Sequence, residues 1–167
     1  MLMKTNHSYF SILRCTLFSI FLLSSCNQEP DFKVVRQQVL DQHDLLMIDG
    51  EKAMHLQMTL DTLGKTGFRK LKQEQPDLDT AAEQQQIKML LADLNKADDS
   101  MNDWMHAFNP DAEGKSNHDA VLYFKKEKLK VNQIDSLYRK ALTQAGKYLN
   151  RFHLAPDTST AVHQHTM

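Results

Sequence analysis

The chain has 167 residues, and its 20 lysines and arginines nearly balance its 21 aspartates and glutamates, which gives a net charge of −1. This length suits one ordinary domain, and without a basic excess the chain lacks the electrostatic signature of nucleic-acid binding. Its two cysteines are Cys15 and Cys26. Because no thiol follows residue 26, the rest of the chain has no disulfide, thiolate metal site or cysteine nucleophile.

Residues 1–25 have the layout of a secretory signal peptide. Lys4 and Arg14 are the only lysines, arginines or carboxylates in this segment, and the apolar run CTLFSIFLL ends at Leu23. The run has the length of a signal-peptide core. It is shorter than the roughly 20 apolar residues that a membrane-spanning helix needs. We therefore expect residues 1–25 to be removed from the mature protein.

The four residues that follow the apolar core are Leu23, Ser24, Ser25 and Cys26. They resemble the lipobox of bacterial lipoproteins, in which the signal peptide is cut before an invariant cysteine. The resemblance implies that the Cys26 thiol takes a diacylglycerol and that its new amino group is acylated. Two or three acyl chains anchor a protein stably, since each buried methylene adds about 0.8 kcal/mol. The alternative is an ordinary secretory signal that ends near a cysteine.

A lipid on Cys26 would place the protein in the cell envelope, held to the membrane by this anchor and with no other cofactor expected. Asn27 stands where an aspartate retains some lipoproteins at the inner membrane, so the outer membrane is favoured. Removing 25 residues, two of them basic, leaves 142 residues with 18 basic and 21 acidic side chains and a net charge of −3.

Residues 31–154 have the composition of long helices. Pro76 and Pro110 separate runs rich in Leu, Met, Ala, Gln, Lys and Glu, which are helix formers. We predict helices over 31–73, 80–108 and 117–152, with 26–30 as a short tether and 155–167 as a disordered tail. Because short connections make neighbouring helices antiparallel, the predicted fold is all-α, an up-down-up bundle of three long helices.

Each predicted helix has an apolar stripe. The second helix follows strict heptad spacing through Ile87, Leu90, Leu94, Ala97, Met101, Trp104 and Phe108. The first helix has Phe32, Val35, Val39, Leu46, Ala53, Leu56, Leu60 and Leu63. The third helix has Phe124, Val131, Ile134, Tyr138, Ala141, Ala145, Tyr148 and Phe152. These stripes predict a single core between the three helices.

Local signals refine the ends of the helices. The first stripe continues through Gly64 and Gly67, which predicts a continuous helix with a soft point there. The segment 80–83, TAAE, has the form of a capping box. Because the third helix is shorter than the first, we expect the first helix to be uncovered near Phe68 and Leu71, where a partner could bind.

Two segments, QHDLLM at 42–47 and ADDSMNDWMHAF at 97–108, resemble paired motifs of uncharacterised small helical lipoproteins that often carry the automatic name "viral A-type inclusion protein". The resemblance extends from Val35 to Leu149 and implies an envelope location and a helical body, without an established activity. Antiparallel helices bring the two segments together in the half of the bundle nearer the membrane. The candidate functional residues are His43, Asp44, Met47, Asp98, Met101, Trp104 and Met105.

Two interpretations of this cluster remain open. Thioethers and imidazole suit Cu(I), which favours a soft-metal or chaperone-like stress protein whose ligands are His43, Met47, Met54, Met101 and Met105. In the structural interpretation, methionines fill gaps in a helical core and His43 bonds across to Asp98. This second interpretation assigns no metal site, and it treats the HQHTM terminus at 163–167 as part of the tail.

Motifs of common enzymes are missing from the chain. It has no glycine-rich phosphate loop, no Gly-x-Ser-x-Gly elbow and no Glu-x-x-His pair of the kind that builds di-iron bundles. The basic segments at 65–73 and 124–133 could attract anionic lipid, although solvated helix faces explain them equally well. We assign no catalytic residue and expect a non-enzymatic, lipid-anchored bundle that binds envelope proteins or self-associates.

Overall fold

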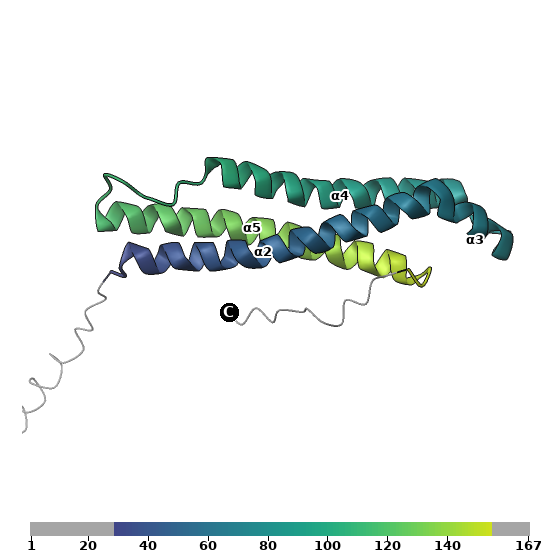
Figure 1. The fold of residues 1–167 in the computed structure, drawn as a ribbon, viewed down its shortest axis with the longest axis horizontal. Coiled ribbons are helices and arrows are strands. Elements are labelled where there is room, and N and C mark those ends of the chain that lie inside the picture. Colours follow the sequence, from purple (N-terminus) through teal and green to yellow (C-terminus); the bar gives the residue numbers. More distant parts are fainter. Residues whose placement is uncertain (1–28, 155–167) are drawn as a thin grey trace, which may run out of the picture. The chain divides into compact units, whose positions relative to one another are not determined.

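The computed structural model describes residues 29–154. Of these residues, 83% are helical and none lies in a strand, which confirms the all-α prediction. The chain divides into compact units at 1–30 and 31–167, and all the described helices lie in the second unit (Figure 1). The predicted signal peptide, the lipobox with Cys26 and the C-terminal tail lie outside the described residues.

The first long helix, α2 (Phe32–Thr62), begins at an aspartate cap. The Asp31 carboxylate accepts a hydrogen bond from the backbone N–H of Lys33 at 2.9 Å. This bond satisfies one of the backbone donors that every helix start leaves exposed. The cap fixes the start of α2 at Phe32, six residues after Cys26.

A wider helical turn follows α2. The π-helix η2 (Leu63–Gly67) leads directly into α3 (Phe68–Glu74), so the chain stays helical through both glycines. In such a turn the normal hydrogen-bond pattern shifts by one residue. The carbonyl of Gly64 accepts a hydrogen bond from the Gln84 side chain of the next long helix. The soft point at Gly64 and Gly67 is thus a π turn and not a break.

The second long helix is α4 (Thr80–Ala107), and its cap differs from the predicted one. The Asp79 carboxylate accepts hydrogen bonds from Ala81 N and Ala82 N, both at 3.1 Å. The Glu83 carboxylate instead pairs with Arg151 at 2.6 Å. The predicted capping box is therefore wrong by one residue, because an aspartate directly before Thr80 supplies the acceptor.

The third long helix is α5 (Asn117–Asn150), and it begins as predicted near Ser116. The Ser116 hydroxyl accepts from Asp119 N at 3.1 Å and donates to the Asp119 carboxylate at 2.7 Å. Between α4 and α5 the chain passes through Pro110, which cannot continue a helix. Pro110 thus accounts for the end of α4 at Ala107, and the Ser116 cap accounts for the start of α5 at Asn117.

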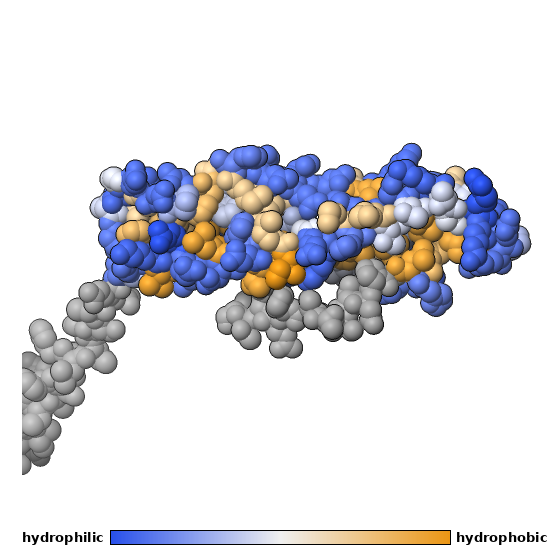
Figure 2. Space-filling view, in the orientation of Figure 1, coloured by the Kyte–Doolittle hydropathy of each residue, from blue (hydrophilic) through white to orange (hydrophobic). Residues whose placement is uncertain are grey.

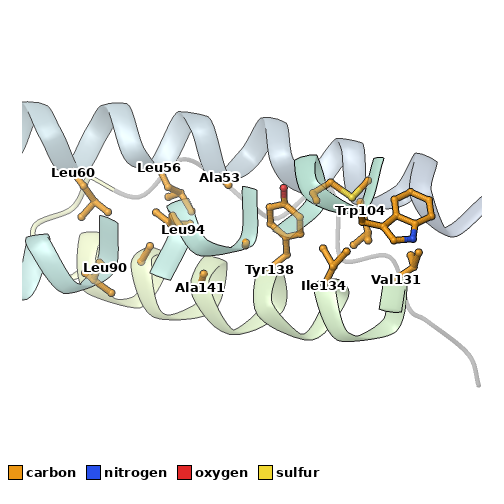
Figure 3. Packing of buried hydrophobic residues seen from close by; sticks show 14 of the residues in the cluster. Ala53, Leu56, Leu60, Leu90, Leu94, Trp104, Val131, Ile134, Tyr138 and Ala141 are labelled. Atoms are coloured by element: carbon orange, nitrogen blue, oxygen red, sulfur yellow. The ribbon is translucent and has the colours of Figure 1, made fainter. Parts of the chain in front are cut away.

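The apolar stripes meet in one core (Figure 3). The buried residues of α4 are Ile87, Leu90, Leu94, Ala97, Met101 and Trp104. They are six of the seven heptad positions, and Phe108 is partly buried. Each fully buried leucine stabilises the fold by roughly 1.5–3 kcal/mol relative to an exposed one. This core lies within 31–154, so a chain that starts at Asn27 should fold alone.

Polar side chains connect the helices at several levels. Phe32 N donates to the Asn117 side chain at 3.0 Å, and Lys128 donates to Gln38 at 2.9 Å, which joins α2 to α5. Gln57 donates to Asn95 at 3.0 Å, which joins α2 to α4. Polar contacts therefore join α2 both to α5 and to α4.

The expected uncovered face near Phe68 and Leu71 is not present. Phe68 is buried, and its ring packs edge-on against Phe152 with centroids 6.2 Å apart. Leu71 is partly buried against the core. The prediction was wrong because a final turn after α5 carries Phe152 over α3.

Among the described residues, no helix combines the length and the apolar character needed to cross a bilayer.

Candidate functional site

An open groove of about 690 Å³ lies between α2 and α4. Met47 and Met54 line it from α2, and Met101 and Met105 line it from α4. Its charged lining residues are Glu51 and Asp98, and no lysine or arginine of the described chain is part of its wall. We call this feature the methionine groove. It unites four of the methionines that the sequence marked as candidates.

The methionines differ in exposure. Met101 is buried, whereas Met47 and Met54 are half exposed, at 48% and 49%. Met105, on the α4 side of the groove, is 37% exposed. A buried methionine fills space in a core, but exposed flexible thioethers form an adaptable apolar surface. Met101 thus fills the core, as the structural interpretation expects, whereas Met47, Met54 and Met105 lie at the surface.

His43 does not line the methionine groove. Its Nδ1 lies 3.0 Å from a carboxylate oxygen of its neighbour Asp44. Its ring packs beside Trp104 with centroids 5.8 Å apart, and Trp104 in turn stacks on Phe108 at 4.6 Å. His43 is thus held by a local carboxylate and an aromatic pair, at a position separate from the groove wall.

Asp98 connects all three long helices, with partners other than the expected ones. Its two carboxylate oxygens accept hydrogen bonds from the Tyr138 hydroxyl of α5 and the Gln57 amide of α2, both at 2.8 Å. The predicted bond from His43 to Asp98 is therefore wrong. The Tyr138 hydroxyl points away from α5 toward α2 (Figure 3). It donates to Asp98 at the wall of the groove.

Burial and the Asp98 carboxylate raise the pKa of the Tyr138 hydroxyl well above its ordinary value, with a smaller contribution from Asp49. The native state therefore keeps this proton at a pH where the unfolded chain has lost it. We expect the free energy of unfolding to fall as pH rises above about 10, the unfolded value, by up to about 1.4 kcal/mol per pH unit. Urea titrations between pH 8 and pH 11 should show a shallower decline in Tyr138→Phe. An unchanged slope would contradict the raised pKa.

A second buried polar contact lies next to the candidate tryptophan. The indole Nε1–H of Trp104 donates to Glu127 of α5 at 2.9 Å, and Lys130 donates to the other oxygen of Glu127 at 2.8 Å. Glu127 is 4% exposed. Because a buried charge is costly without partners, these bonds fix the level at which α4 and α5 meet.

Metal ligands of the commonest kinds do not gather in the described residues. No group of three or more histidine, cysteine, aspartate or glutamate side chains there could hold an ion. The four thioethers of the methionine groove are the remaining candidate donor set. Cys26, the lipobox and His163–Met167 lie outside the described residues.

Comparison with known proteins adds no relative. No family model matches the chain, and no curated protein or solved structure is significantly similar to it. Function must therefore be argued from the residues themselves.

Sequence reasoning missed several residues of the groove wall. Gly50, Glu51, Gln57, Asn102 and Tyr138 belong to it. Gly50 matters because a Cβ there would lie 3.2 Å from the Tyr138 hydroxyl oxygen. The sequence signal was a glycine within a helix, opposite a tyrosine that occupies a core position and needs a polar partner.

Proposed function

We propose that the protein is a lipid-anchored, non-enzymatic module of the cell envelope that binds a partner protein in the methionine groove. The lipobox-like residues Leu23 to Cys26 support the anchor, and Asn27 favours the outer membrane. The observation that carries the binding role is the groove itself, with exposed thioethers from two helices. Such surfaces repack around different apolar side chains.

We further propose that α2, α4 and α5 form an up-down-up bundle. Contacts between α2 and α5 join residues whose numbers rise together, from Phe32 with Asn117 to Gln42 with Asn132. Between α2 and α4 the numbers run in opposite directions, since Gly64 meets Gln84 while Gln57 meets Asn95. This topology favours a rigid groove, because each helix would pack against the other two.

The partner segment that fits the methionine groove is an amphipathic helix with basic flanks. Apolar side chains at helical spacing would pack against Met47, Met54 and Met105, the mode that helix-in-groove complexes use. Glu51 and Asp98 supply negative charge and no lysine or arginine among residues 29–154 lines the wall, so lysine or arginine on the partner is complementary. The partner is an envelope protein or a second copy of this chain.

Site-specific photo-crosslinking in intact cells tests this function. A photoreactive residue would replace Met54 in the full lipidated chain, and Met89 would be the matched control because both are 49% exposed and Met89 lies outside the groove. We expect a discrete crosslinked product from position 54 that disappears with Met47→Lys, and none from position 89. Equal products from both positions would contradict groove binding.

A defined probe gives a second test. A fluorescent helical peptide of leucine and lysine should bind the chain that starts at Asn27, with affinity reduced at least about tenfold by Met54→Lys. Met89→Lys adds the same charge outside the groove and should leave binding unchanged. If both variants bind the peptide equally, the acidic methionine groove is not its site.

A second candidate function is soft-metal binding, with a chaperone-like role in envelope stress. The observation in its favour is that Met47, Met54, Met101 and Met105 line one groove, since thioethers are ligands for Cu(I). His43, the imidazole in the original set, does not line it. The proposed site would then consist of four sulfur donors.

Titration with Cu(I) against a competing chelator separates this candidate from simple packing. Met47→Leu combined with Met101→Leu should weaken binding strongly. The matched control is Met58→Leu with Met89→Leu, which removes two exposed methionines that do not line the groove. Equal affinity for both double variants would rule the site out.

A further inference from the structure

Beyond its first turn, which carries the exposed carboxylate of Asp119, α5 presents only basic charged side chains on its exposed surface. From Ala120 to Asn150 its exposed charged side chains are all basic: Lys125, Lys126, Lys130, Arg139, Lys140 and Lys147. The two carboxylates in this stretch, Glu127 and Asp135, are buried. Charge is therefore segregated over the surface, although the chain as a whole is nearly neutral.

Part of this positive charge is already engaged within the fold. Lys130 pairs with Glu127 at 2.8 Å, Arg139 with Asp135 at 3.0 Å and Lys140 with Asp93 at 3.5 Å. Lys125 and Lys126 are exposed and form no ion pair with another described residue. Lys147 shares this property near the end of α5, whereas Lys125 and Lys126 form an adjacent pair near its start.

Two exposed leucines flank these lysines. Leu122 is 44% exposed and Leu129 is 63% exposed. The spacings of three, four and seven residues place Leu122, Lys125, Lys126 and Leu129 on one face of α5. We call these four residues the Leu/Lys patch. Figure 2 shows apolar side chains lying between hydrophilic ones on the face of the molecule that it draws.

The Leu/Lys patch lies at the end of the bundle where the chain leaves the proposed anchor. Phe32 N bonds Asn117, and the rings of Phe32 and Phe124 stack with centroids 6.2 Å apart. The first turns of α5 therefore lie beside the first turn of α2. Cys26 precedes Phe32 by six residues, and a chain of that length reaches at most roughly 20 Å.

We propose that the Leu/Lys patch docks on the anionic surface of the bilayer that holds the lipid anchor. The lysines meet lipid phosphates while the leucines enter the boundary between headgroups and acyl chains, as on interfacial amphipathic helices. None of the four residues of the Leu/Lys patch lines the methionine groove, so the docked patch and the groove's partner would use different side chains. The inference rests on the proposed anchor, because the anchor keeps a bilayer within reach.

Lysine footprinting on the processed lipoprotein tests the docking. The full lipidated chain would be reconstituted into vesicles of pure phosphatidylcholine or of phosphatidylcholine with phosphatidylglycerol. The rate at which each lysine is acetylated would then be measured by mass spectrometry. We expect Lys125 and Lys126 to be acetylated at least about threefold more slowly on the anionic vesicles. Lys88 and Lys96 on α4, both exposed, should be modified at equal rates on both.

Equal rates at Lys125 and Lys126 on the two vesicles would overturn the proposal. Protection that also arises on neutral vesicles and grows with protein density would overturn it in favour of a contact between copies. Failure of the protein to enter either vesicle would count against the anchor and not against the patch.

Sedimentation with anionic vesicles tests whether the Leu/Lys patch binds a bilayer when the chain carries no lipid anchor. The chain that starts at Asn27 should bind, and Lys125→Glu with Lys126→Glu should reduce partitioning at least about tenfold. Lys88→Glu with Lys96→Glu makes the same change of charge on α4 and should have little effect. Equal losses in both double variants would mean that only net charge matters, which would contradict a docking face on α5.

Discussion

Replacing Phe124 with alanine is expected to lower the free energy of unfolding by about 3–5 kcal/mol. The side chain is fully buried, and its ring contacts Phe32 of α2, Phe108 at the end of α4 and its neighbour Tyr123, with centroids 6.2, 6.3 and 5.1 Å away. Alanine would leave a cavity that three separate segments would have to collapse to fill. Urea unfolding followed by circular dichroism measures the loss.

Leu122→Ala is the matched control for this prediction. It removes a large apolar side chain two residues away on the same helix, but Leu122 is 44% exposed. Its effect should remain within about 1 kcal/mol. If Phe124→Ala cost no more than Leu122→Ala, the aromatic cluster would not be part of a tightly packed core.

The sequence predicted the helices and their buried faces because both depend on local information. In α4 a strict heptad runs from Ile87 to Trp104, and each of these positions is buried. Proline and aspartate or serine caps then determine where the helices end. The missed Asp79 cap shows the usual limit, since adjacent residues can compete for the same role.

Polar partners could not be predicted in the same way. The heptad placed Asp98 at the edge of the core, but from there a side chain on either of two helices could reach it. The rotation of α5 decides the outcome, since it directs the Tyr138 hydroxyl to Asp98 at 2.8 Å and leaves His43 with Asp44. Such rotations depend on the packing of all three helices together.

The candidate cluster was predicted as a set of residues but not as a surface. Met47 follows Leu46, which takes the buried position, so the thioether is displaced to the edge of the apolar stripe and becomes half exposed. The same displacement at Met54, beside Ala53, opens the groove. Sequence spacing marks both residues as apolar and helical, whereas exposure depends on how closely α4 approaches.

The positive charge on the exposed face of α5 could not be predicted from the sequence, for a related reason. Glu127 and Asp135 make α5 appear mixed in sequence, yet both are buried. Once they are removed from the exposed face, only lysine and arginine remain as exposed charged residues between Ala120 and Asn150. A count of charges along a helix therefore predicts its surface potential only when the burial of each carboxylate is known.

Trp104→Phe is expected to lower the free energy of unfolding by about 2–4 kcal/mol. Phenylalanine can keep the stacking on Phe108, but it removes the indole donor that lies 2.9 Å from Glu127. A carboxylate that is 4% exposed then retains only Lys130 as a hydrogen-bond donor among the contacts described. Desolvating a charged group with fewer partners accounts for most of the expected loss.

The double variant Trp104→Phe with Glu127→Gln isolates this contact. A neutral amide costs less to bury than a carboxylate, so the two substitutions together should destabilise the protein less than the sum of their separate effects. We expect a coupling of at least about 1 kcal/mol in urea unfolding at neutral pH. Additive effects would show that Trp104 stabilises the bundle through its ring alone, and that the buried carboxylate does not set the level at which α4 meets α5.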